Sequence, residues 1–70
     1  MIEIKDIKVG NKVFHHNPKE TYDIVDTSSR MKIDDEWIDC IIYKPNYNNN
    51  YTYFARTIKD FMKNFTLIIE

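Results

Sequence analysis

The sequence predicts a mostly β fold of five to six short strands, with one short helical turn before the last strand. Twenty-nine of the 70 residues are isoleucine, valine, threonine or aromatic, the residue types that favour strands. Leucine and alanine, which favour helices, occur once each. Short apolar segments separated by turn residues recur along the chain, as is typical of small all-β domains.

Length and charge restrict the possible functions. A chain of 70 residues makes one domain, which we expect to span residues 1–70. Its net charge of −1 gives no general attraction to nucleic acid or acidic lipid. The single cysteine, Cys40, excludes an internal disulfide, and we find no apolar segment typical of a signal peptide or a membrane span. We therefore expect a cytoplasmic protein.

Six segments have the alternating or apolar patterns of strands, and turn residues separate them. Gly10 and Asn11 tolerate positive φ and predict a tight turn. Pro18 fixes a turn at 17–20, and the asparagines of 46–50 favour a hairpin loop. The polar segment 28–36 is expected to be a strand end, a loop and an acidic turn. The expected strands are 2–9, 12–16, 22–27, 37–44, 51–56 and 66–69.

The segment 37–44 is the strongest predicted strand because it is apolar on both faces. One face carries Ile38, Cys40 and Ile42, and the other carries Trp37, Ile41 and Tyr43. A strand covered on both sides is expected in the middle of a small barrel or sandwich.

The segment 57–65 changes to a helical period. Ile58, Phe61, Met62 and Phe65 fall on one helical face, and Thr57 is suited to cap the first turn. Short strands with one helical turn before the last of them favour a small SH3-like barrel. An OB-fold is the second choice, and a four-stranded sheet with one helix is the third.

Residues 13–68, about four fifths of the chain, carry an ordered set of short motifs. The set is a basic-aromatic start at 14–16, Lys19 followed by Tyr22 and an apolar residue, Ile41-Ile42-Tyr43, Phe54-Ala55-Arg56, and the pair Phe61 and Phe65. In this order and spacing the chain resembles the domain of unknown function 1653 family of small bacterial and phage proteins. The resemblance implies a small SH3-like β fold and no established activity.

Candidate catalytic and metal-binding residues are few, and each has a simpler structural interpretation. Adjacent side chains on a strand point to opposite faces. Of His15 and His16, we therefore expect one to be packed and the other to be solvated. Cys40 lies within an apolar strand, where a buried, inert thiol is expected. The acidic segment 34–36 lacks the spacing of a calcium loop. We therefore expect no enzyme activity, no metal site and no cofactor.

The aromatic residues around one hairpin are the strongest candidate for a binding site. Tyrosine beside asparagine offers rigid contact area with a polar group, which is common at interfaces. The alternative is that these rings fill the core. Arg56 is expected to stack on a tyrosine or to pair with Asp39. The candidate binding residues are Trp37, Tyr43, Tyr47, Tyr51, Tyr53 and Arg56.

These observations favour a non-catalytic binding module that recognises a protein or peptide through the aromatic hairpin face. A phage-encoded inhibitor of a host system is one form of this hypothesis, and self-association through an edge strand is another. The alternatives are an enzyme's accessory subunit and a nucleic-acid-binding barrel. The latter would need its basic residues on one face, namely Lys8, Lys12, Lys19, Lys44 and Arg56.

Overall fold

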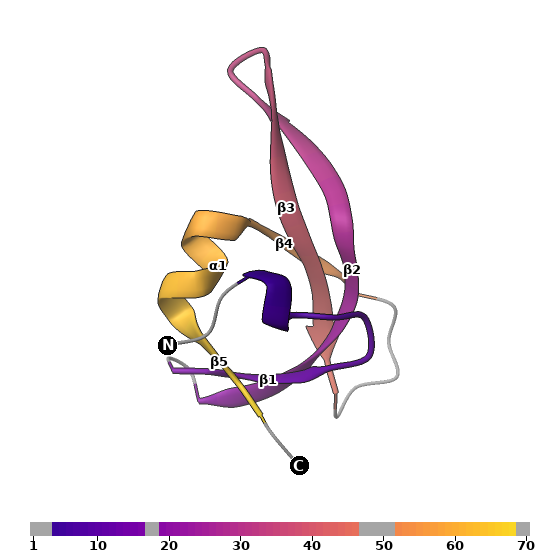
Figure 1. Cartoon of the computed structure of the whole chain (residues 1–70), viewed down its shortest axis with the longest axis vertical. Coiled ribbons are helices and arrows are strands. Elements are labelled where there is room, and N and C mark those ends of the chain that lie inside the picture. The colour runs from indigo at the N-terminus through magenta and orange to yellow at the C-terminus, as the bar shows by residue number, and fades with distance from the viewer. Residues whose placement is uncertain (1–3, 17–18, 47–51, 69–70) are drawn as a thin grey trace.

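Five strands of the computed structural model form one antiparallel sheet in the order β4-β3-β2-β1-β5 (Figure 1). The structure describes residues 4–16, 19–46 and 52–68. The elements are η1 (Ile4–Asp6, a 3-10 helix), β1 (Lys12–His15), β2 (Glu20–Ile33), β3 (Glu36–Pro45), β4 (Phe54–Thr57), α1 (Ile58–Asn64) and β5 (Phe65–Leu67). The predicted mostly β fold, with one short helix before the last strand, is confirmed, and the sheet is open.

The longest hairpin joins β2 and β3, and it projects beyond the rest of the molecule (Figure 1). Ile33 pairs with Glu36, so only Asp34 and Asp35 form the turn. Both aspartates have positive φ, 49° and 66°, as a type I′ hairpin turn requires. The prediction of a loop within 28–36 is wrong except at this turn. Polar side chains suggested a loop, but a strand outside the core can keep its pairing with polar residues on its faces.

Two irregularities in β2 bend the strand near Asp26. The pairing with β3 shifts register on each side of Asp26, which marks β-bulges. The Asp26 carboxylate accepts a hydrogen bond from the Ser29 hydroxyl and another, of 3.0 Å, from the Ser28 backbone N–H. These two bonds, with that of Ser29 the stronger, lower the pKa of Asp26. The bulges separate the core-forming half of β2 from the projecting half.

The N-terminal strand predicted at 2–9 is wrong, because the described part of this segment contains the helix η1 instead. Ile7, which is 4% exposed, enters the core. The following turn is confirmed, with Gly10 at a φ of 90°. Gly10 N–H donates to the Ile24 carbonyl, and the Ile24 N–H donates to the Asn11 carbonyl. The hydrogen bonds of this turn, and not strand pairing, therefore attach the N-terminal segment to β2.

The core lies between the sheet and α1. Phe61 is fully buried, and the Phe65 ring stacks on it with centroids 4.3 Å apart. Ile58 and Met62 pack against the same cluster, so the predicted apolar helix face is confirmed. Phe65 belongs to that face, but it is the first residue of β5. The other buried apolar residues of the cluster are Ile7, Val13, Tyr22, Ile24, Ile41 and Tyr43.

The helix begins where the sequence predicts. The Thr57 hydroxyl accepts a hydrogen bond of 3.2 Å from the Asp60 backbone N–H, which makes Thr57 the N-cap. The expected asparagine loop and the start of the returning strand fall largely on 47–51, outside the described residues. Within the described ranges, no helix is long and apolar enough to cross a lipid bilayer.

Candidate functional site

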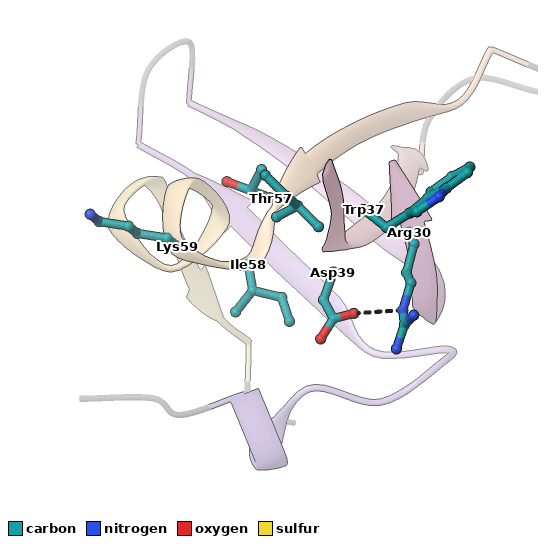
Figure 2. Close-up of a pocket in the computed structure, with 7 residues that line it drawn as sticks. Arg30, Trp37, Asp39, Thr57, Ile58 and Lys59 are labelled. Carbon is teal, nitrogen blue, oxygen red and sulfur yellow. Dashed lines mark hydrogen bonds and ion pairs between the residues drawn. The ribbon is translucent and has the colours of Figure 1, made fainter. Parts of the chain in front are cut away.

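A groove of about 760 Å³ lies between the projecting β2–β3 hairpin and the start of α1 (Figure 2). We call it the Trp37 groove. Ile38 and Ile58 supply its aliphatic side chains, and Trp37 supplies its aromatic one. The remaining lining residues are Arg30, Asp39, Thr57 and Lys59. The groove is therefore an apolar surface with charged groups at its borders, which is the usual composition of a ligand-binding concavity.

Trp37 is the most exposed large apolar side chain in the described residues, at 64%. It pairs across the hairpin with Lys32, near the turn and beyond the end of the core. Its ring extends to the side of the groove away from Lys59 (Figure 2). An indole in this position adds little to the core, and its free surface is available to a partner.

Arg30 and Asp39 form a cross-strand ion pair on the groove wall. The Arg30 Nε atom lies 3.1 Å from a carboxylate oxygen of Asp39, and both side chains are well exposed. An exposed pair of this kind contributes only about 0–1 kcal/mol to folding. Its charges can therefore be rearranged toward a ligand at little cost in stability.

The four predicted binding residues that the structure describes do not lie at one site. Tyr43 is 5% exposed and belongs to the core, where its ring meets those of Tyr22, Phe61 and Phe65. Trp37 lies six positions earlier on β3, roughly 20 Å away along an extended strand. Tyr53 is exposed, but it precedes β4 at the Tyr43 end of the sheet. Tyr47 and Tyr51 lie outside the described residues. The core interpretation thus holds for Tyr43.

Arg56 is bound within the fold and not at the groove. Its guanidinium donates to the Tyr43 hydroxyl at 2.8 Å and to the Asp60 carboxylate at 2.7 Å, and lies 5.6 Å from the Phe65 ring centre. The bond to Tyr43, then that to Asp60, raises the pKa of Arg56. The expected pairing of Arg56 with Asp39 is wrong, since Asp39 pairs with Arg30.

The two histidines occupy different environments, as predicted. His15 is buried, with its ring stacked on that of Phe65 at 4.5 Å. Burial, followed by the charge of Arg56, lowers the pKa of His15. His16 is exposed, and its ring hydrogen-bonds to the Thr66 hydroxyl. In 4–16, 19–46 and 52–68, no group of three acidic, histidine or cysteine side chains is arranged to hold a metal ion.

Cys40 is buried at 1% exposure, as predicted. Burial, together with the negative charges of Asp26 and Asp39, raises the pKa of its thiol. The thiol is therefore protonated near neutral pH, and it lacks the activation that a cysteine nucleophile needs.

Basic side chains needed by the nucleic-acid hypothesis are partly engaged elsewhere. Lys12 Nζ lies 3.0 Å from a carboxylate oxygen of Asp23, and Arg56 is held by Tyr43 and Asp60. Nucleic-acid binding stays a prediction.

Most groove residues were missed by sequence reasoning. Trp37 was selected, but Arg30, Ile38, Ile58 and Lys59 come from segments interpreted as loop, core strand or helix. Sequence reasoning missed these residues because it did not predict how far the β2–β3 hairpin extends. Once β2 continues to Ile33, the pairing of Arg30 with Asp39 follows from a two-residue turn.

Comparison with known proteins gives no relative. No family model matches the chain, and no curated protein and no solved structure matches it. The function is therefore argued from the geometry of the Trp37 groove.

Proposed function

We propose that this protein is a non-catalytic binding module that recognises a segment of a partner protein in the Trp37 groove. The observation that carries the proposal is Trp37, which is 64% exposed and lines a groove that the apolar Ile38 and Ile58 also line. Tryptophan, when a partner covers it, is among the residues that contribute most to binding energy. From the sequence we expected the partner to bind the aromatic hairpin face. The contact surface that we propose instead lies at the other end of β3.

The composition of the groove favours a protein segment over a polyanion. An acidic side chain, Asp39, stands beside Arg30 at the groove wall, and the turn next to Trp37 contributes Asp34, Asp35 and Glu36. Carboxylates so close to the contact surface repel phosphates. A peptide can pair its charges with both signs and bury its apolar side chains against Trp37.

We also propose that the fold is an SH3-like barrel, as the sequence resemblance implies. Two observations support this: β5 returns to pair with β1, and one short helix, α1, directly precedes β5. The strong bend of β2 at its bulges also suits such a fold.

Selection from a phage-displayed library of random decapeptides tests the proposed function. The immobilised targets are the wild-type protein, Trp37→Ala and the matched control Tyr53→Ala, which removes a second exposed aromatic residue away from the groove. We expect peptides that bind the wild type and Tyr53→Ala equally and bind Trp37→Ala about 30-fold more weakly. Equal binding to Trp37→Ala, or no enrichment over it, contradicts the proposal. Thermal unfolding of each variant confirms that it is folded.

A further inference from the structure

One edge of β3 is left without a neighbour next to the Trp37 groove. β4 pairs with β3 only from Tyr43 to Cys40, and its last residue, Thr57, lies opposite Cys40. The chain then turns into α1, while β3 extends back to Glu36. In the described part of the chain, β3 is therefore paired over residues 36–39 on its β2 side alone.

The hairpin turn determines which backbone groups face this edge. Ile33 and Glu36 flank a two-residue turn, so the N–H and C=O of Glu36 point toward β2. Backbone groups alternate in direction along an antiparallel strand, and β3 has no bulge between the turn and its pairing with β4. The N–H and C=O of Trp37 consequently point away from β2, toward the side that β4 has left. A ligand with an extended backbone can bond to both.

Side chains next to the edge match an extended occupant. Thr57, the last residue of β4, and Ile58, the first residue of α1, line the groove together with Ile38 and Asp39 of β3. Successive side chains of an added strand point alternately to the two faces of the sheet. Neighbouring residues of β3 also alternate, so Ile38 lies on one face and Trp37 and Asp39 lie on the other. Alternate side chains of the occupant would thus meet Ile38 and Trp37 in turn.

The charges at the two ends of the groove differ. Lys59, which is exposed, extends from the α1 end. The turn at the other end carries Asp34, Asp35 and Glu36, all exposed, against the single positive charge of Lys32. A segment running in the direction of β4 therefore meets a positive group first and a negative group last.

From these observations we propose that the bound segment adds a strand to β3 beside Trp37, antiparallel to β3 and continuing the line of β4. Its side chains are acidic at its N-terminal end, apolar in the middle and basic at its C-terminal end. Strand addition of this kind derives affinity from backbone bonds and specificity from alternate side chains. This inference rests on the proposed function, because it specifies the conformation of the segment that the Trp37 groove recognises.

A second copy of the chain is the alternative occupant of this edge. In an antiparallel pair, residues lie opposite each other only if their backbone groups point in the same sense, so two such edges would place Trp37 of one copy opposite Trp37 or Asp39 of the other. We propose a peptide as the occupant because its charges can match Lys59 at one end of the groove and the acidic turn at the other.

The test is an N-methyl scan of the tightest peptide that the decapeptide selection yields. Each version carries one methylated backbone nitrogen, which removes one hydrogen-bond donor. For an added strand we expect an alternating pattern: methylation at every second central position weakens binding at least tenfold, and at the others changes it less than threefold. If binding needs Trp37 but shows no alternation, strand addition is overturned while the proposed function stands. If binding does not need Trp37, the proposed function itself fails.

Charge reversal on the helix tests the direction of the segment. Lys59→Glu should weaken binding of the same peptide about threefold to tenfold in low salt, and the difference should shrink in high salt. The matched control is Lys63→Glu, an exposed position on α1 that does not line the groove. Equal effects of both variants would overturn the proposed direction. A dimer that Trp37→Ala dissociates would overturn the assignment of the edge to a peptide.

Discussion

Arg56 Nε donates a hydrogen bond of 2.8 Å to the hydroxyl of Tyr43, and this contact connects β4 to the core side of β3. The same guanidinium reaches the Asp60 carboxylate on α1 at 2.7 Å. Arg56 thereby joins strand, helix and core at a partly buried position. Tyr43 and Arg56, both candidates for partner contact by sequence, have a structural role in the fold.

Tyr43→Phe should lower the free energy of unfolding by about 1 kcal/mol, because Arg56 loses an acceptor at a partly buried position. Peptide binding in the Trp37 groove should not change. The measurement is urea unfolding followed by circular dichroism, with Asp39→Asn as the control. That variant breaks the exposed pair with Arg30 and should cost under about 0.5 kcal/mol. A loss of peptide binding in Tyr43→Phe would argue instead for a direct contact role of the hydroxyl.

Stability should fall as the pH falls through the range in which histidine titrates. Burial, then Arg56, lowers the pKa of His15 in the folded state below its ordinary value of 6.5. The unfolded chain therefore binds the proton more readily, so the contribution of neutral His15 is complete above about pH 6.5 and is lost as the pH falls toward the folded pKa. Urea midpoints between pH 7.5 and 5 measure this slope.

The matched variants for that pH dependence are His15→Phe and His16→Gln. The slope should flatten in His15→Phe, which removes the titrating ring, and should persist in His16→Gln, which alters the exposed neighbour. An unchanged slope in His15→Phe would show that other groups determine the pH dependence.

Asp35→Gly should stabilise the protein by about 0.5 kcal/mol, because Asp35 has a φ of 66° and glycine adopts this conformation at lower cost. The control is Glu36→Gly, which places glycine at a strand position and should destabilise the hairpin. Thermal unfolding compares the two. Destabilisation by Asp35→Gly would argue against the type I′ turn.

Cys40 should be unreactive in the folded protein. Its thiol is 1% exposed and burial raises its pKa, so both access and thiolate formation are suppressed. We expect a thiol-reactive chromophore to label the native protein at least a hundredfold more slowly than the urea-unfolded protein at pH 8. Labelling at similar rates in the two states would contradict the burial of Cys40.

The sequence was informative where local chemistry determines structure. The spacing of Ile58, Phe61 and Met62 predicted α1, and the hydroxyl of Thr57 predicted its N-cap. These features depend on neighbours three or four residues away. The positive φ of Gly10 is of the same kind, since glycine adopts it without steric cost.

The sequence was misleading where tertiary pairing overrides local pattern. Alternating residues at 2–9 suggested a strand, yet Ile7 of that segment is buried in the core and the chain before it forms η1. The polar residues of 28–33 suggested a loop, although they form the projecting half of β2. The Trp37 groove depends on that hairpin and on α1 together, so no local motif could predict it.

Fluorescence of Trp37 tests the central claim most directly, because this is the only tryptophan in the chain. In the free protein we predict emission typical of an indole in water, strongly quenched by acrylamide. Addition of a selected peptide to saturation should shift the emission to shorter wavelength and reduce the quenching. Titration calorimetry under the same conditions establishes that the peptide is bound. Unchanged emission and quenching with the peptide bound would contradict recognition in the Trp37 groove.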